Sequence, residues 1–179
     1  EGSARDLEII GKYGVKPPYI FALGNIHPRK NLGRLLRAYV RLGDIVPNRP
    51  GMVWGGIERW ASHQLVECAR QVGIVFTGFI AIEDLPSFYR QAEMLVYPSL
   101  YEGFGLPPVE AMACGTPVIT SNTTGLPEAV GGAALKVEPT SVDALTKAMR
   151  WLLVDERLRH KLRVRGFAQA QRFTWKATA

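Results

Sequence analysis

Short apolar runs alternate with segments of helical periodicity along most of this chain. The runs are three to five residues long, and a Gly or Pro follows most of them closely. Continuous apolar runs of this length are typical of parallel strands that are buried on both faces of a sheet. We therefore predict strands over residues 19–23, 52–54, 74–77, 94–97, 118–121 and 134–137.

Between these runs, apolar residues recur three and four positions apart, which is the spacing of one buried helix face. In the first such segment the apolar positions are Leu32, Leu35, Leu36, Tyr39 and Val40. Proline is tolerated in the first turn of a helix, and Ser or Thr can cap its start. We predict helices over residues 31–43, 58–72 and 84–92, a helix from Pro107–Pro108, one capped by Thr140 or Ser141, and one from Glu156 towards Arg172.

Strands that alternate with helices through short loops indicate a parallel sheet with helices on both faces. The predicted fold class is therefore α/β: a three-layer, Rossmann-like domain with a mostly parallel sheet of about six strands. Residues 1–18 are largely polar and end at Pro17–Pro18, so we expect a lead-in or linker there and the domain over residues 19–175.

Composition narrows the class of protein. The chain has 179 residues, of which 47% are hydrophobic and 21% charged, as in one ordinary globular domain. No apolar run approaches the roughly 20 residues that span a bilayer. Because the chain begins with Glu, we expect a fragment of a longer protein. Cys68 and Cys114 lie among helical apolar neighbours, which favours buried thiols in a reducing compartment, and we expect a cytoplasmic location.

The net charge of +6 is unevenly distributed. Basic residues crowd the last quarter of the chain: Arg157, Arg159, His160, Lys161, Arg163, Arg165, Arg172 and Lys176. One interpretation is a solvated helix face. A second is a surface for anionic lipid headgroups at the inner face of the membrane. A third, nucleic-acid binding, would show a steep salt dependence, but no aromatic-studded basic sheet supports it, so no nucleic-acid partner is predicted.

The stretch from Tyr97 to Gly115 carries the most chemistry. A loop with two glycines leaves a predicted strand and enters a helix, and Glu102 and Glu110 flank it with seven residues between them. Prolines contribute no N–H group, so donors for an anion or a sugar hydroxyl must come mainly from Gly103, Phe104, Gly105 and Leu106.

The other motifs also follow predicted strands, over residues 24–30, 78–79 and 122–128. In parallel sheets, ligands collect at the carboxyl ends of the strands. We therefore expect these loops to form one site.

This set of motifs resembles the family 4 (group 1) retaining glycosyltransferases, which have the two-domain GT-B architecture. The resemblance rests on Glu102 to Glu110, on Gly115 to Asn122, on Gly125 to Glu128, and on Pro28 to Asn31, and it extends from about Tyr19 to Trp175. It implies the C-terminal, donor-binding domain of such an enzyme. The N-terminal acceptor domain would be absent from this chain, which should then transfer sugar poorly or not at all.

The resemblance also implies roles for individual residues. Lys30 and Arg29 would hold the donor diphosphate and stabilise it as a leaving group, with Arg29 or Asn25 in the position of the family's arginine. Glu102 would contact the donor sugar, and Glu110 would accept hydrogen bonds from the ribose hydroxyls. Further donor-binding positions are Gly24, Asn25, Phe79, Gly103, Phe104, Gly105 and Leu106. His27 is a candidate ligand contact or a local hydrogen-bonding residue.

The implied reaction moves a hexose from a nucleotide-diphosphate sugar to an acceptor hydroxyl with retention. GDP-mannose is the favoured donor, no metal or other cofactor is expected, and a glycan or lipid-linked sugar would be bound through the N-terminal domain. Two alternatives stay open here. Glu102 and Glu110 could be the acid and nucleophile of a glycoside hydrolase, or the domain could bind nucleotide sugars without turnover.

Overall fold

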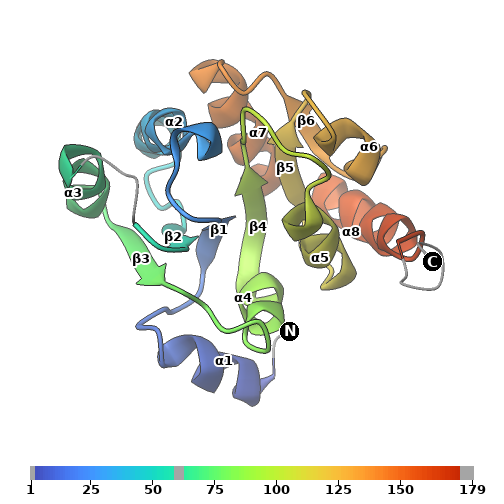
Figure 1. Cartoon of the computed structure of the whole chain (residues 1–179), viewed down its shortest axis with the longest axis horizontal. Coiled ribbons are helices and arrows are strands. Elements are labelled where there is room, and N and C mark those ends of the chain that lie inside the picture. The colour runs from blue at the N-terminus through green and yellow to red at the C-terminus, as the bar shows by residue number, and fades with distance from the viewer. Residues whose placement is uncertain (1–2, 59–62, 174–179) are drawn as a thin grey trace.

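The computed structural model describes residues 3–58 and 63–173, and it has a six-stranded sheet between two layers of helices (Figure 1). All five strand pairs are parallel, which confirms the predicted α/β class. The strands are β1 (Tyr19–Leu23), β2 (Gly51–Gly55), β3 (Ile74–Gly78), β4 (Ala92–Tyr97), β5 (Val118–Ser121) and β6 (Leu135–Val137). Each lies on one of the predicted apolar runs.

The helices cover both faces of the sheet. They are α1 (Ala4–Gly11), the 3₁₀ turn η1 (Pro28–Lys30), α2 (Leu32–Ile45), α3 (His63–Gln71), α4 (Leu85–Gln91), α5 (Leu106–Ala113), α6 (Leu126–Val130), α7 (Val142–Val154) and α8 (Glu156–Ala170). On one face α2 packs against α7 beside α3. On the other, α1, α4, α5 and α6 form a layer, and α8 lies over α5.

Alternate side chains of the strands supply two separate cores. In β1, Ile20 and Ala22 join the core under α2, α3 and α7, whereas Tyr19 and Phe21 join the core under α4 and α5. Successive residues of a strand point to opposite faces, so a strand covered on both sides must be apolar throughout. This requirement explains why the strands read as continuous apolar runs.

The strand order is β3-β2-β1-β4-β5-β6. From β1, the strands β2 and β3 follow towards one edge of the sheet, and β4, β5 and β6 follow towards the other edge. A switch in strand order leaves a crevice at the carboxyl ends of the two central strands. The loops that follow β1 and β4 flank this crevice, and they contain Arg29, Lys30 and Glu102.

Two short helices were not predicted from the sequence. Within the expected lead-in, α1 is capped by Ser3 through a reciprocal box with Asp6, and it packs against α4 with Ile10 buried. The expected linker therefore contains an ordered helix, while the division of the domains at residue 19 stays a prediction. The second helix is α6, whose first turn contains Glu128.

The remaining sequence predictions concern helix boundaries, the two cysteines and membrane-spanning segments. Ser141 is the N-cap of α7. The first residues of the helix predicted over 58–72 lie partly outside the described range, as do Trp175 and Lys176. Both cysteines are free, but the prediction of two buried thiols is wrong for Cys68, which is exposed on α3, and Cys114 is only partly buried. Among the described residues, no helix has the length and apolar character needed to cross a membrane.

Candidate functional site

The loop between β1 and α2 folds back on itself and brings Lys30 beneath Gly24. Gly24 has φ of 129°, and a Cβ there would lie 2.8 Å from Cε of Lys30. His27 caps η1, because its Nδ1 accepts a hydrogen bond from the Arg29 N–H at 3.2 Å. Glycine at position 24 thus leaves room for the lysine side chain.

Asn31 joins this loop to two others. Its backbone is left-handed, with φ of 64°. The Nδ2 group donates to the carbonyl oxygens of Pro98 at 3.0 Å and Pro139 at 2.7 Å, which follow β4 and β6. In addition, the Leu100 N–H donates to the Arg29 carbonyl at 2.7 Å. The loops at the crevice are therefore cross-linked by hydrogen bonds.

The glycine-rich loop after β4 is held on its other side by the loop after β5. The Glu102 N–H donates to Oγ1 of Thr124 at 3.2 Å, and the Gly125 N–H donates to the Glu102 carbonyl at 3.3 Å. A Cβ at Gly125 would lie 2.0 Å from the carbonyl oxygen of Gly103. Only glycine allows the two loops to approach this closely, so the Glu102 backbone has a fixed position.

Lys30, Tyr97 and Glu102 form a buried network between the two loops. Nζ of Lys30 lies 2.6 Å from Oε1 of Glu102, and it also donates to the Tyr97 hydroxyl. That hydroxyl donates to the same Oε1 at 3.1 Å. Nη1 of Arg29 lies 3.5 Å from Oε2. A carboxylate, a phenol and two cations are thus gathered at the switch point of the sheet.

Burial and charge act on this network in opposite directions. Burial lowers the pKa of Lys30 by more than the Glu102 carboxylate raises it. For Glu102, burial is the largest single influence and raises the pKa, but the hydrogen bonds and charge of Lys30, with help from Ser99 and Tyr97, lower it overall. Burial raises the pKa of Tyr97, which keeps the phenol protonated. Glu102 is therefore held as a carboxylate.

A row of backbone donors follows Glu102. Gly103, Phe104, Gly105 and Leu106 have no acceptor for their N–H groups among the described residues. Gly105 is the N-cap of α5, with φ of 97°. No side chain in the described part of the chain accepts a hydrogen bond from the first N–H groups of this helix. Free N–H groups at a helix start favour an anion or a polar oxygen.

Glu110 lies in α5 at the exposed surface. Its Oε2 accepts a hydrogen bond from the hydroxyl of the buried Tyr89 at 2.8 Å. The two motif glutamates thus have different surroundings: Glu102 is buried and paired with cations, and Glu110 is open to solvent on one side.

A cavity of about 540 Å³ opens beside this network. It is lined by Leu23, Gly24, Asn25, His27, Arg29, Lys30, Tyr97 and Pro107. The size is in the range of small-molecule sites. Cations line one part of it, as a phosphate ligand requires.

The match to a known family agrees with this geometry. A family model described as "Glycosyl transferases group 1" matches residues 7–169. The chain belongs to this family. The resemblance found in the motifs is confirmed, and the match also includes most of α1, which the sequence interpretation had left outside the domain.

Individual relatives of this glycosyl transferase chain include two curated proteins. It is 41% identical over 177 residues to the O-antigen chain mannosyltransferase B of Escherichia coli, covering 96% of this chain and 46% of that protein. It is 32% identical over 171 residues to the GDP-mannose-dependent alpha-(1-6)-phosphatidylinositol monomannoside mannosyltransferase of Mycolicibacterium smegmatis, covering 87% of this chain and 44% of that protein. The chain thus spans less than half the length of these relatives.

Among solved structures, the C-terminal domain of a glycosyl transferase group 1 family protein from Francisella tularensis has a TM-score of 0.76 at 25% identity. The likeness covers 95% of this chain and 93% of that one. The group 1 glycosyl transferase domain described here therefore has the fold of the C-terminal half of a GT-B enzyme.

Five of the predicted site residues of this glycosyl transferase domain come together at the cavity. Gly24, Asn25, Arg29 and Lys30 line the cavity, and Glu102 is bonded to Lys30. Phe79, at the end of β3, is not among the lining residues and is 69% exposed. The ring of Phe104 packs edge to face against Phe173, with 5.0 Å between centroids. The ring of Phe104 therefore packs against the segment that follows α8, although 36% of the residue stays exposed.

The structure separates the roles of Asn25 and Arg29. Oδ1 of Asn25 accepts a hydrogen bond from the Ile57 N–H at 3.1 Å, which ties the β1 loop to the β2 loop. Arg29 is 49% exposed and lies beside Glu102. Of the two, only Arg29 brings a positive charge to the cavity.

Two tyrosines of this site were missed in the sequence. Tyr97 was read only as the end of a strand, and Tyr89 only as part of an apolar helix face. The position of Tyr97 at the carboxyl end of a parallel strand is a weak sequence indication that it belongs to the site. No local pattern marks Tyr89, because its partner Glu110 lies in another helix.

The surroundings of Glu102 argue against its use as the acid of a glycoside hydrolase. Such an enzyme needs one carboxyl group with a raised pKa as the acid. The pKa of Glu102 is lowered, and its carboxylate is already paired with Lys30. Within residues 3–58 and 63–173, no group of three or more His, Cys, Asp or Glu is arranged to hold a metal ion.

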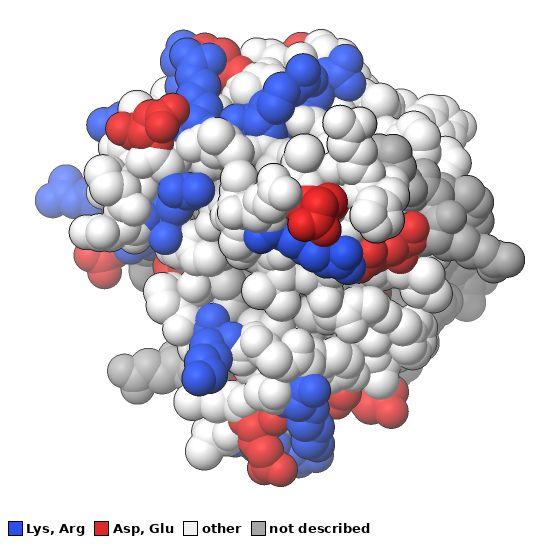
Figure 2. Space-filling view, turned by 90° about the vertical axis from the view of Figure 1, so that its left-hand side faces the viewer, with Lys and Arg blue, Asp and Glu red and all other residues white. Residues whose placement is uncertain are grey.

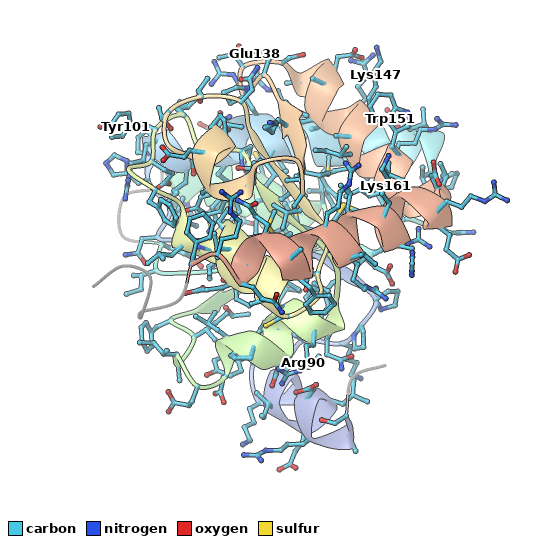
Figure 3. All side chains as sticks on the ribbon, turned by 90° about the vertical axis from the view of Figure 1, so that its right-hand side faces the viewer. Arg90, Tyr101, Glu138, Lys147, Trp151 and Lys161 are labelled. Carbon is cyan, nitrogen blue, oxygen red and sulfur yellow. The ribbon has the colours of Figure 1, made fainter. Side chains whose placement is uncertain are left out.

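Several basic residues of α8 have partners within the domain. Arg159 donates to the carbonyl oxygens of Leu152 and Leu153 at the end of α7. Arg163 donates to the Gly115 carbonyl after α5 at 3.0 Å. Figure 3 shows α8 crossing the face that it views, with Lys161 labelled there, whereas on the face shown in Figure 2 acidic and basic side chains are interspersed. Some of the basic side chains of α8 thus donate hydrogen bonds to carbonyl oxygens at the ends of other helices.

Proposed function

We propose that this domain binds the diphosphate of a nucleotide-sugar donor in the cavity at the switch point of the sheet. The observation that carries the proposal is the position of Lys30. It is a buried cation at the carboxyl end of the central strands, next to a second cation and a row of free N–H groups. A diphosphate group has the charge and the acceptor oxygens that these donors require.

The same cations would act during transfer. When the bond between the anomeric carbon and the diphosphate breaks, negative charge grows on the departing phosphate oxygen. Donors that are already in place stabilise this charge without reorganising. Lys30 and Arg29 are held in place by Glu102 and by the hydrogen bonds between the loops. This chain would thus contribute leaving-group stabilisation to a retaining hexosyl transfer.

The two motif glutamates have separate proposed roles. Glu102 lies beside the cations and would contact hydroxyls of the donor sugar, with Gly103 to Leu106 adding N–H groups. Glu110 has one carboxylate oxygen without a partner among the described residues, and this oxygen would accept from a ribose hydroxyl. Phe79 would contact the base from outside the cavity.

The names of the relatives support mannose from GDP-mannose as the transferred sugar and its donor. One relative is called an O-antigen chain mannosyltransferase, and another is called GDP-mannose-dependent. The acceptor, a glycan or a lipid-linked sugar, would be bound by an N-terminal domain of the full enzyme, and no metal is proposed for the donor site because Lys30 and Arg29 supply the positive charge.

A cytoplasmic location with peripheral membrane contact is part of the proposal, but two leucines of α8 are turned towards the core and are not available to lipid. Leu162 of α8 is buried in the core, and Leu158 is partly buried against it. Exposed candidates on this side are Val164 and Phe167 of α8, together with Trp151 of α7. Binding of this chain to vesicles with anionic lipids, compared with neutral vesicles, tests the contact.

The donor site is tested by calorimetric titration of this chain with GDP, UDP and ADP, in EDTA and again in Mg²⁺. Saturable binding of one nucleotide in EDTA is expected, with Lys30→Ala weakening it about thirtyfold or more, because the loss removes a charged hydrogen bond. Lys161→Ala on the exposed face of α8 is the matched control and should bind normally. Binding that is insensitive to Lys30→Ala would disprove the proposed site. Absence of binding, both here and in a longer protein with the acceptor domain, would disprove the function.

A further inference from the structure

Two buried tyrosines each donate a hydrogen bond to one of the motif glutamates. The Tyr97 hydroxyl donates to Oε1 of Glu102 at 3.1 Å, and the Tyr89 hydroxyl donates to Oε2 of Glu110 at 2.8 Å. Tyr97 is 3% exposed and Tyr89 is 1% exposed. Neither tyrosine is needed for the charge balance of the proposed site, so their hydroxyls call for a separate explanation.

Tyr89 is fixed from several sides. Its ring packs edge to face on Phe21 of β1, with 5.6 Å between centroids. Its carbonyl oxygen accepts a hydrogen bond from Oγ1 of Thr116 at 2.6 Å. Burial raises the pKa of Tyr89, and the Glu110 charge adds to this effect, so the hydroxyl keeps its proton and stays a donor. The hydroxyl is therefore a rigid point in an otherwise apolar core.

Glu110 is the solvent-facing partner in this pair. It is exposed, and a glutamate side chain at a helix surface has several rotamers. The hydrogen bond from Tyr89 restricts the carboxylate to one orientation. Oε2 is occupied, and Oε1 has no partner among the described residues. A ligand hydroxyl that approaches α5 would meet an acceptor oriented in advance.

Tyr97 has a different place in the site. Its hydroxyl accepts from Lys30 and donates to Glu102, and its ring lines the cavity. Thr120 donates to the Tyr97 carbonyl at 3.1 Å, which fixes the residue at the end of β4. Tyr97 thus orients the ammonium group of Lys30 and the carboxylate of Glu102 together.

We infer that Tyr89 and Tyr97 are positioning residues that act on different parts of the donor. Tyr89 acts through Glu110 on recognition of the ribose hydroxyls. Tyr97 acts through Lys30 and Glu102 on the diphosphate. The inference rests on the proposed function, and it divides the donor site into two halves, each with its own tyrosine.

The test uses Tyr89→Phe and Tyr97→Phe, which keep the rings and remove only the hydroxyls. Three probes are titrated into each protein: the nucleoside diphosphate that binds the wild type most tightly, its 2′-deoxy counterpart, and inorganic pyrophosphate. Tyr39→Phe is the matched control. It also removes a buried phenol's hydrogen bond, to the Pro50 carbonyl at 3.1 Å, but Tyr39 lies in the middle of α2 and does not line the cavity.

For Tyr89→Phe we expect binding of the ribonucleotide to weaken about fivefold to tenfold, the usual effect of one lost hydrogen bond. The preference for ribose over deoxyribose should fall by the same factor, and pyrophosphate binding should stay within twofold of wild type. For Tyr97→Phe we expect pyrophosphate and both nucleotides to weaken by a common factor, with the ribose preference intact. Tyr39→Phe should change none of these values.

Some results would overturn the inference. A Tyr89→Phe protein that keeps the full ribose preference, or that loses pyrophosphate and nucleotide affinity equally, would show that Tyr89 has only a structural role. A Tyr97→Phe protein with unchanged pyrophosphate affinity would do the same for Tyr97. If neither this chain nor a longer protein with the acceptor domain binds any of the probes, the proposed function fails and the inference fails with it. Normal wild-type binding with unaffected variants disproves the inference alone.

Discussion

Two buried carboxylates in this domain have similar partners and lie at opposite ends of β4. Asp6 accepts hydrogen bonds from Nε and Nη2 of Arg90, at 2.9 and 2.6 Å, and from the Ser87 hydroxyl at 2.8 Å. Glu102 is paired with Lys30 and the Tyr97 hydroxyl. In Figure 3, Arg90 lies between α4 and α1 at the bottom of the molecule, and Tyr101, next to Glu102 in sequence, lies at the upper left.

The difference lies in what surrounds each pair. The Asp6 group joins α1 to α4 before β4 begins, and both of its carboxylate oxygens are occupied by protein donors, including the Ser3 N–H. The Glu102 group follows the carboxyl end of β4, and its partners Lys30 and Tyr97 line a cavity. An ion pair whose carboxylate oxygens are occupied by donors of the same helices stabilises the fold, whereas an ion pair beside a cavity can exchange a partner for a ligand.

The largest expected effect separates the two groups by binding. We predict that Lys30→Ala lowers nucleotide-diphosphate affinity about thirtyfold or more, since it removes a charged donor from a buried site. Asp6→Asn should leave this affinity within twofold. Titration calorimetry on both variants measures the contrast, and equal losses in both would abolish the distinction between a structural and a ligand-exchanging pair.

Stability should show the reverse order. We predict that Asp6→Asn lowers the free energy of unfolding by about 1–3 kcal/mol, because a buried charged acceptor is lost from four hydrogen bonds. The loss should lie below that of a fully buried pair, since the Arg90 side chain is 44% exposed. Denaturant unfolding of both proteins, fitted with the same dependence of free energy on denaturant concentration, measures this difference in stability. An unchanged midpoint would mean that α1 does not depend on this cluster.

A pH series on these proteins sharpens the comparison. The Arg90 guanidinium holds the pKa of Asp6 far below its usual range. Below an ordinary carboxyl pKa of about 4 the unfolded chain binds a proton that the folded Asp6 resists. The stability from Asp6 is thus fully present above that pH and is lost as the pH falls further.

The difference in unfolding free energy between the wild type and Asp6→Asn should therefore be constant from about pH 6 to 8 and should shrink below about pH 4. Guanidinium chloride melts at each pH measure it. A difference that stays constant down to pH 2 would contradict the proposed role of the Arg90 pair.

The smallest effect is expected at Arg29. Its guanidinium is 49% exposed and lies 3.5 Å from Glu102, so the ion pair contributes at most about 1 kcal/mol to folding. We predict that Arg29→Ala weakens nucleotide-diphosphate binding only severalfold and that added salt reduces the difference further. Titrations at two ionic strengths test this. A loss as large as that of Lys30→Ala would make Arg29 an equal partner at the diphosphate.

The sequence predicted the sheet well because each strand is buried on both faces and is therefore a continuous apolar run. It missed α1, because the largely polar residues 1–18 favoured a linker, and α6, which has only five residues. Lys30 and Glu102 could be proposed as site residues from their motifs. Their direct contact could not, because it joins positions 72 apart in the chain. The hydrogen bonds of Tyr89 and Tyr97 likewise depend on tertiary packing that no local pattern contains.

The cross-links made by Asn31 bear on how fast a donor can bind. One side-chain amide joins the loops that follow β1, β4 and β6, so the entropy of ordering these loops is lost when the domain folds. Binding then requires little rearrangement, and the association rate would be set by diffusion and by the attraction between the phosphates and the cations. Differences in affinity among donors would accordingly appear in their dissociation rate constants.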